Sequence, residues 1–218
     1  MSVRSAVAAK RRAPPNLRLI VTCAAGVVLV LAMALSTKVV KIDSAANVRA
    51  GNFVAAEYGS TEFPKVQAAM EQRAVAAGTL AAAIAKDPAA AAKQYGVPTG
   101  AGPEFSVKFS GVVGKGDFGT YAVAVGGVPK SVVIQVQTGP AIIGTDLRDA
   151  TSTINFGQFT NQIDYQNAGA ALNNEMKKQV LAKVDAAKLK GKTISVVGAF
   201  QLTDPKNWLV TPAKLNVQ

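Results

Sequence analysis

Histidine is absent from this 218-residue chain, and cysteine occurs once, as Cys23. Without histidine, the chain lacks the commonest general base and the commonest transition-metal ligand, so Ser-His-Asp and Cys-His catalytic sets are excluded. A single cysteine forms neither an internal disulfide nor a cysteine-based zinc site. A Ser-Lys dyad needs no histidine, but nothing singles out one pair. We therefore predict no catalytic residue, no metal and no cofactor, and expect that the protein is not an enzyme.

Nucleotide-binding motifs are also missing. The glycine-rich stretch GVVGKGD lacks the spacing of a phosphate-binding loop and the Ser or Thr that should follow its lysine. The G-x-S-x-G motif that carries the nucleophilic serine of many hydrolases does not occur either. We interpret the glycine-rich stretches KGDFG and VGGVPK as turns between strands.

The net charge of +11 is concentrated near the N-terminus. Residues 1–43 contain seven basic residues and one acidic residue, a net charge of +6, which leaves +5 for the other 175 residues. The lysines near the C-terminus are not interleaved with aromatic residues, as they are in many single-strand-binding surfaces. The charge therefore favours a membrane-topology signal, and we predict no nucleic-acid partner.

Residues 19–37 contain no charged side chain, and Arg18 and Lys38 flank them. Nineteen residues in a helix span about 28 Å, close to the roughly 30 Å hydrocarbon core of a bilayer. We expect a transmembrane signal-anchor helix, with a basic cytoplasmic tail over residues 1–18 and the remaining chain in the periplasm of a single-pass inner-membrane protein. Cleavage near Ala32-Met33-Ala34 and lipidation of Cys23 are the alternatives.

Residues 38–103 read as a helical annex. Pro64 is placed as a first helical residue, followed by an alanine-rich helix. Asp87 before Pro88 predicts a helix N-cap, and Gly96 predicts the end of that helix.

Residues 104–218 read as a small domain of strands with one inserted helix. Phe105, Val107 and Phe109 alternate with polar residues, as in a half-buried strand. TYAVAV, KSVVIQVQTG and the short GPAIIG follow, then a helix from Asp164 to Val184, then TISVVGAFQL and WLVTPAKLNV. This order predicts an α+β fold: a small antiparallel OB-like β-barrel, with the N-terminal helical annex and the preceding transmembrane helix.

The stretch GTDLRDATSTINFGQFTNQIDY, residues 144–165, crowds charged, amide and aromatic side chains together. Thr145 is expected to cap a short helix whose first turn holds Asp146, and Arg148 to pair with a carboxylate. Aromatic rings beside amides are typical both of sugar sites and of an internally bonded loop. The candidate ligand-binding or structural residues are Thr145, Arg148, Asp149, Phe156, Phe159, Asn161, Gln162 and Tyr165. A glycosidase-like pair, Asp149 with Asp164, is the enzymatic alternative.

GPAIIGTDLRDATSTINFGQFTNQIDYQNAGAALN, with the later LKGKTISVVGAF and LVTPAKLNV, resembles a bacterial family of predicted periplasmic lipoproteins, domain of unknown function 2291. The resemblance covers about residues 43–217. It implies a genomic context beside sugar ABC transporters and no established catalytic residue. The family signature falls on Gly144, Arg148, Asp149, Phe156, Phe159, Asn161 and Gln162. Cys23 departs from the family's lipidation pattern because the apolar run continues beyond it.

These observations predict a membrane-anchored periplasmic accessory or binding protein, with the inner membrane, sugar ABC transporter components and a carbohydrate ligand as expected partners. A periplasmic glycan hydrolase and a structural subunit of a membrane complex are the two other hypotheses.

Overall fold

The computed structural model describes residues 17–36 and 53–218. The chain divides into two compact units, Met1–Ala46 and Asn47–Gln218. All residues of the buried hydrophobic core lie in the second unit, so Asn47–Gln218 has what it needs to fold by itself.

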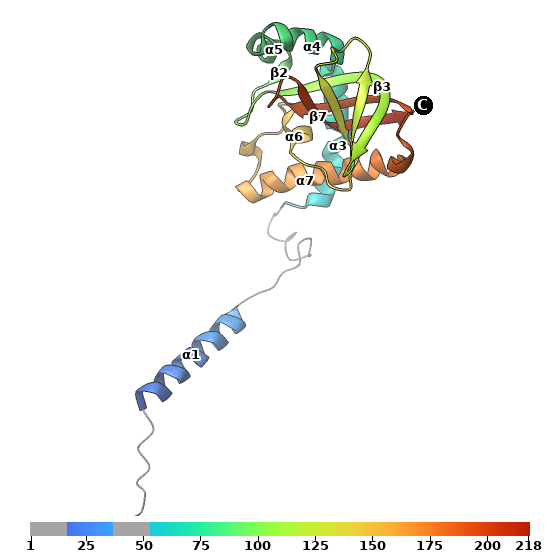
Figure 1. Cartoon of the computed structure of the whole chain (residues 1–218). Coiled ribbons are helices and arrows are strands. Elements are labelled where there is room, and N and C mark those ends of the chain that lie inside the picture. The colour runs from blue at the N-terminus through green and yellow to red at the C-terminus, as the bar shows by residue number, and fades with distance from the viewer. Residues whose placement is uncertain (1–16, 37–52) are drawn as a thin grey trace, which may run out of the picture. The chain divides into compact units, whose positions relative to one another are not determined.

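The first unit contains helix α1, Leu17–Ser36 (Figure 1). Within the parts of the chain that the structure describes, no helix combines the length and hydropathy needed to cross a membrane. The spanning helix expected over residues 19–37 is therefore not confirmed, and residue 37 lies outside the described residues.

Five strands of the second unit pair in a closed ring. Strand β3 pairs with β4, β4 with β5, β5 with β7, β7 with β6, and β6 pairs back with β3. Their bounds are β3 Glu104–Asp117, β4 Thr120–Val125, β5 Val133–Gln137, β6 Thr193–Gln201 and β7 Asn207–Val217. All five were expected from the sequence, β3 from its alternation of apolar and polar residues. The segment GPAIIG, in contrast, forms no strand and belongs to the loop after β5.

One pairing differs from the antiparallel sheet predicted above. β5 and β7 run parallel, with Ile134 opposite Trp208 and Val136 opposite Val210. The physical reason is the connection: a helix crosses between β5 and β6, and the hairpin from β6 to β7 then brings the last strand back beside β5 in the same direction.

The core is organised around three stacked aromatic rings. Phe200 lies between Phe105, at a centroid distance of 5.6 Å, and Trp208, at 4.6 Å. All three side chains have no exposed surface, and the Trp208 Nε1–H donates to the Pro205 carbonyl oxygen. Each ring comes from a different strand, so the stack ties β3, β6 and β7 together.

Within residues 53–218, three helices precede the ring: α3 Ala55–Arg73, α4 Ala77–Lys86 and α5 Pro88–Tyr95. Helix α5 agrees with its predicted signals, because the Asp87 carboxylate accepts from the backbone N–H groups of Ala89 and Ala90. Helix α3 does not begin at Pro64 but nine residues earlier, and Pro64 lies inside it. Proline removes one helical hydrogen bond and its ring crowds the carbonyl four residues earlier, but the buried face formed by Phe63, Val66 and Met70 holds the helix across this point.

The helical segment is joined to the strands by two short strands, β1 Val75–Ala76 and β2 Gly96–Val97, which both pair with β3. The remaining elements follow β5: α6 Asp146–Asp149, η1 Phe156–Gln158, α7 Gln162–Gln179, η2 Leu181–Lys183 and η3 Ala186–Lys188. The expected helix over 164–184 thus begins two residues earlier and ends in a separate 3₁₀ turn.

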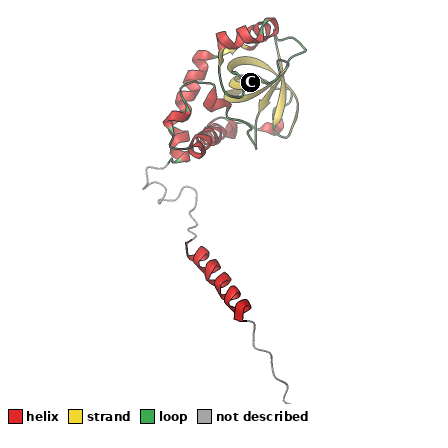
Figure 2. Ribbon diagram, turned by 90° about the vertical axis from the view of Figure 1, so that its left-hand side faces the viewer, coloured by secondary structure: helices red, strands yellow, loops and turns green. Residues whose placement is uncertain are grey.

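Helices α3 and α7 pack against each other next to the strands; in Figure 1, α7 runs below the strands and α3 rises behind them, and Figure 2 shows the helices beside the strands. Gly59 permits their close approach, since a Cβ there would lie 2.7 Å from the Ala171 carbonyl oxygen of α7. This contact positions the N-terminal half of α3 against the segment between α6 and α7, where the candidate site is found.

The aromatic stack predicts a large stability effect. Phe200→Ala should lower the free energy of unfolding by about 3–5 kcal/mol, because it removes two ring contacts and leaves a cavity. Urea denaturation of the Asn47–Gln218 fragment measures this. Phe118→Ala, at a side chain that is 94% exposed, is the control and should change the value by less than about 0.5 kcal/mol. Equal effects would contradict the central role of the stack.

Candidate functional site

A buried ion pair anchors helix α6. The Arg148 Nε donates to Asp149 Oδ1 at 2.7 Å and its Nη2 donates to Oδ2 at 2.9 Å, a bidentate arrangement. The Thr145 hydroxyl donates to the same Oδ2 at 2.7 Å. The side chains of Arg148 and Asp149 are 9% and 12% exposed. The predicted pairing of Arg148 with a carboxylate is present, whereas the Thr145 side chain bonds Asp149 and does not cap the backbone of α6.

The same arginine reaches helix α7. Its Nη1 donates to the Tyr165 carbonyl oxygen at 3.0 Å, and the guanidinium carbon lies 3.7 Å from the centre of the Tyr165 ring. The Tyr165 hydroxyl donates to Asp149 Oδ1 at 3.3 Å. Burial raises the pKa of Tyr165, and the adjacent Asp149 charge raises it further. We call Thr145, Arg148, Asp149 and Tyr165 the arginine clamp; in it, both oxygens of Asp149 accept hydrogen bonds from within the protein.

The two predicted amide residues, Asn161 and Gln162, lie at the start of α7. Asn161 is the N-cap of α7: its Oδ1 accepts from the backbone N–H of Asp164 at 2.9 Å, and its Nδ2 donates to Asp164 Oδ2. Gln162 is exposed in the first turn of that helix. Phe156, half exposed in η1, packs edge-on against the Tyr165 ring at 5.8 Å.

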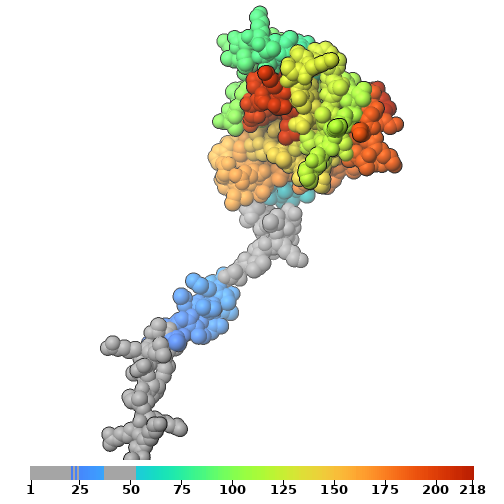
Figure 3. Space-filling model, in the orientation of Figure 1, coloured from blue at the N-terminus to red at the C-terminus, as the bar shows by residue number. Residues whose placement is uncertain are grey.

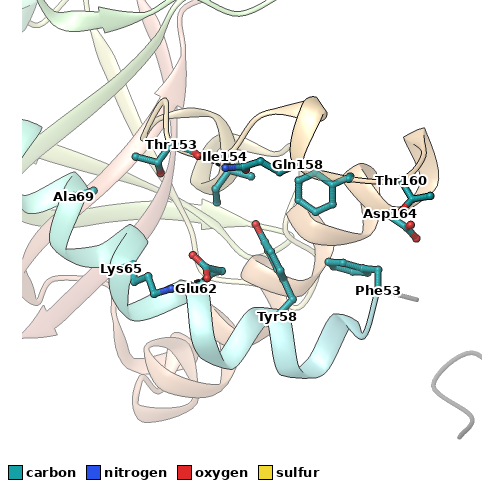
Figure 4. A pocket seen from close by; sticks show the side chains of 11 residues that line it. Phe53, Tyr58, Glu62, Lys65, Ala69, Thr153, Ile154, Gln158, Thr160 and Asp164 are labelled. Atoms are coloured by element: carbon teal, nitrogen blue, oxygen red, sulfur yellow. Dashed lines mark hydrogen bonds and ion pairs between the residues drawn. The ribbon is translucent and has the colours of Figure 1, made fainter. Parts of the chain in front are cut away.

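A pocket of about 530 Å³ lies between α3 and the segment 153–164 (Figure 4). One wall comes from α3 and from Phe53, which precedes it. The opposite wall comes mainly from the loop that precedes α7. The lining residues are Phe53, Tyr58, Glu62, Lys65 and Ala69 on the first wall, and Thr153, Ile154, Gln158, Phe159, Thr160 and Asp164 on the second.

Aromatic rings form one end of this pocket. Tyr58 lies 5.0 Å from Phe53 and 5.7 Å from Phe159, measured between ring centroids, and its hydroxyl points into the space between the walls (Figure 4). Burial and the nearby Glu62 charge raise the pKa of Tyr58 to about 12. The hydroxyl therefore stays protonated at neutral pH and can donate a hydrogen bond to a ligand.

The polar side of the pocket carries opposite charges. Lys65 donates to Glu62 at 2.8 Å, and their side chains are 66% and 26% exposed. Asp164 lines the opposite wall. The pocket thus offers aromatic faces together with a carboxylate acceptor, an ammonium donor and a phenol donor, the mixture found in sites for small polar ligands.

The pocket and the arginine clamp are linked through Phe159, which lies 5.4 Å from Tyr165. Of the eight residues predicted as a site, Phe159 lines the pocket, four form the clamp, and Phe156, Asn161 and Gln162 support or border the loop. Sequence reasoning missed the α3 wall. The sequence feature that could have revealed this wall is the spacing of Tyr58, Glu62 and Lys65, which places them on one face of a helix.

Two further buried carboxyl groups lie behind the clamp. Glu104 Oε1 accepts from the Gln201 amide at 3.3 Å, whereas its Oε2 has no hydrogen-bond partner among the described residues. Burial, together with the charges of Asp146 and Asp149, raises the pKa of Glu104 to about 8. Burial also raises the pKa of Asp146 to about 6, opposed by a hydrogen bond from Thr211 at 2.6 Å.

Within residues 17–36 and 53–218, no group of three or more His, Cys, Asp or Glu side chains could hold a metal ion. Cys23 is exposed in α1.

Residues 27–216 match the family model of predicted periplasmic lipoproteins, DUF2291. The chain belongs to this family. The family description supports a periplasmic or membrane-associated location and assigns no molecular activity. A search of curated proteins gave no match.

Among solved structures, the chain is similar to an OB-fold protein from Thermotoga maritima. The two sequences are 18% identical, the TM-score is 0.61, and the alignment covers 75% of this chain and 98% of the other. At this identity, the similarity establishes a shared fold: the mixed helices and strands predicted from the sequence have OB-fold topology.

The arginine clamp yields a stability prediction. Arg148→Lys should destabilise the Asn47–Gln218 fragment by about 2–3 kcal/mol, since lysine keeps the charge but loses the bidentate geometry and the stacking on Tyr165. The control is Lys188→Ala, which breaks the exposed pair with Asp185 and should leave the urea midpoint unchanged. Wild-type stability in Arg148→Lys would show that the clamp is dispensable.

The raised pKa of Glu104 predicts that the stability of the domain depends on pH. Because its folded pKa lies above the unfolded value, its stabilising contribution is complete below about pH 4.5 and is lost as the pH rises through 8. Glu104→Gln should therefore flatten the decline in stability across this range and should gain up to about 4 kcal/mol over the wild type at pH 8. Urea denaturation at pH 5 and pH 8 measures the difference; a variant less stable at both pH values would refute the assignment.

Proposed function

We propose that the protein is a non-enzymatic, extracytoplasmic accessory protein that binds a small carbohydrate in the pocket between α3 and residues 153–164. The observation that carries this proposal is the composition of the two facing walls: aromatic rings at one end, Glu62 and Lys65 beside them, and the Tyr58 hydroxyl pointing into the space between the walls.

A sugar ring has apolar C–H faces and a rim of hydroxyl groups. Tyr58 and Phe159 provide surfaces on which such a face can pack, while Glu62 accepts and Lys65 donates hydrogen bonds at the rim. A volume of about 530 Å³ falls within the usual range for small-molecule sites. The genomic context beside sugar transporters that the family resemblance implies would agree with the same ligand class.

We also propose that the segment over residues 19–37 attaches the protein to the inner membrane and that a carbohydrate ABC transporter is its partner. Nineteen uncharged residues between Arg18 and Lys38 support attachment, as does the family description. A Cys23→Ser chain carrying Lys130→Cys tests the topology: an impermeant maleimide should label it once the outer membrane is permeabilised. Labelling that requires lysis of the inner membrane would contradict this placement.

The hydrolase hypothesis gains no support from the geometry. Both oxygens of Asp149 are engaged by Arg148, Thr145 and Tyr165, so this carboxylate is held as a structural anion.

Ligand binding is tested by a thermal-shift screen of the Asn47–Gln218 fragment against mono- and disaccharides. A sugar at a hundred times its dissociation constant should stabilise the fold by about 2.7 kcal/mol. Tyr58→Ala should weaken binding roughly tenfold or more, because the stacking surface and the phenol donor are lost together.

The matched control is Gln162→Ala, at an exposed residue outside the pocket, which should bind as the wild type does. A flat screen, or a shift that Tyr58→Ala leaves intact, would overturn the proposed site and favour a purely structural subunit.

A further inference from the structure

The turn between β3 and β4 presents an aromatic side chain to solvent. Phe118 is 94% exposed and has a backbone φ of 47°, and Gly119 follows with a φ of 78°. These two residues connect the paired Asp117 and Thr120. Two successive residues with positive φ form the tight hairpin turn in which Asn-Gly is preferred.

Phenylalanine is a poor residue for this position. A bulky side chain disfavours the left-handed backbone, where Asn or Gly is accommodated more easily. Since Phe118 is almost fully exposed, no burial within the domain offsets that cost. A strained, exposed aromatic residue indicates a contact outside the domain.

The backbone of this turn is held in place. The Thr138 backbone N–H and hydroxyl both donate to the Gly119 carbonyl oxygen, at 2.7 Å and 3.0 Å. A side chain at Gly119 would collide with the Gly139 carbonyl oxygen, which shows how closely the loop after β5 lies against the turn.

That loop exposes a second apolar side chain, Ile143, which is 68% exposed. The buried Gln137 amide holds its backbone: Oε1 accepts from the Ile143 N–H at 2.8 Å and Nε2 donates to the Ile143 oxygen at 3.0 Å. Gln137 also pairs with Thr120 across the sheet, so Phe118 and Ile143 emerge at the same end of the strands.

Lysines border this end of the sheet. Lys115 lies on β3 just before the turn, and Lys190 and Lys192 flank Gly191, whose N–H donates to the Val113 oxygen at 2.8 Å. All three lysines are exposed, and Asp117 is the acidic residue of the turn. Figure 3 shows the yellow-green β3–β4 region at the surface of the domain.

We propose that this end of the domain, here called the apolar tip and formed by Phe118 and Ile143 with Lys115, Lys190 and Lys192, docks on an anionic bilayer surface. Rigid apolar side chains enter the interface, and lysines beside them attract acidic headgroups. The charge balance of three lysines against Asp117 complements such a surface. The proposed attachment through residues 19–37 keeps the domain near such a surface.

This inference uses the proposed membrane attachment only for proximity, so it is tested without it. The Asn47–Gln218 fragment is sedimented with vesicles of phosphatidylethanolamine and phosphatidylglycerol in a 3:1 ratio, on the order of the charge density at which polybasic surfaces bind. Vesicles of pure phosphatidylcholine give the comparison. We expect binding to the anionic vesicles, and weaker binding at high salt or in Lys190→Gln/Lys192→Gln.

Phe118→Asn is the decisive variant, because asparagine suits the turn and should not lower the melting temperature, whereas vesicle binding should fall about tenfold or more. Ile163→Asn, at an apolar side chain that is 67% exposed and lies outside the tip, is the matched control and should bind as the wild type does. A wild-type fragment that stays in the supernatant, or a Phe118→Asn variant that sediments equally, would overturn the proposal. So would detergent-resistant crosslinks from residue 118 to one protein in cells, with no lipid binding, since the tip would then serve a protein partner.

Discussion

The guanidinium of Arg148 is the group on which the structure of the pocket side of this domain depends. It neutralises Asp149, stacks on Tyr165 and bonds the backbone of α7, so that a four-residue helix and an eighteen-residue helix have a fixed relation. Tyr165 then supports Phe159, which forms part of the pocket wall. A buried ion pair held by four hydrogen bonds from the guanidinium is costly to break, so it fixes the loop between α6 and α7 in place.

Much of the strand architecture could be predicted because local pattern and burial agree. Phe105, Val107 and Phe109 alternate on β3, and the structure buries all three. The parallel pairing of β5 with β7 could not be predicted in this way, since it depends on a connection of about seventy residues whose path no local period encodes. The start of α3 was predicted wrongly because Pro64 was taken as the first residue of a helix. Phe63, Val66 and Met70, on either side of this proline, are buried together.

The candidate site, like the fold, could be predicted from the sequence only in part. The residues that attract attention in the sequence are charged and amide side chains, and the structure uses most of them to bond one another, as Asn161 does with Asp164 and Arg148 with Asp149. The pocket arises where that loop faces Tyr58, Glu62 and Lys65, about ninety residues earlier in the chain. No single segment carries the pattern of such a site, because it exists only once α3 and α7 have packed together.

The ring of strands has a consequence for how the protein is made. β7, Asn207–Val217, alone connects β5 to β6. Until β7 has paired, β5 and β6 both present unpaired edges, and the stack of Phe105 and Phe200 lacks Trp208. Because synthesis proceeds from the N-terminus, the ring closes only after the strand that is made last of the five has emerged.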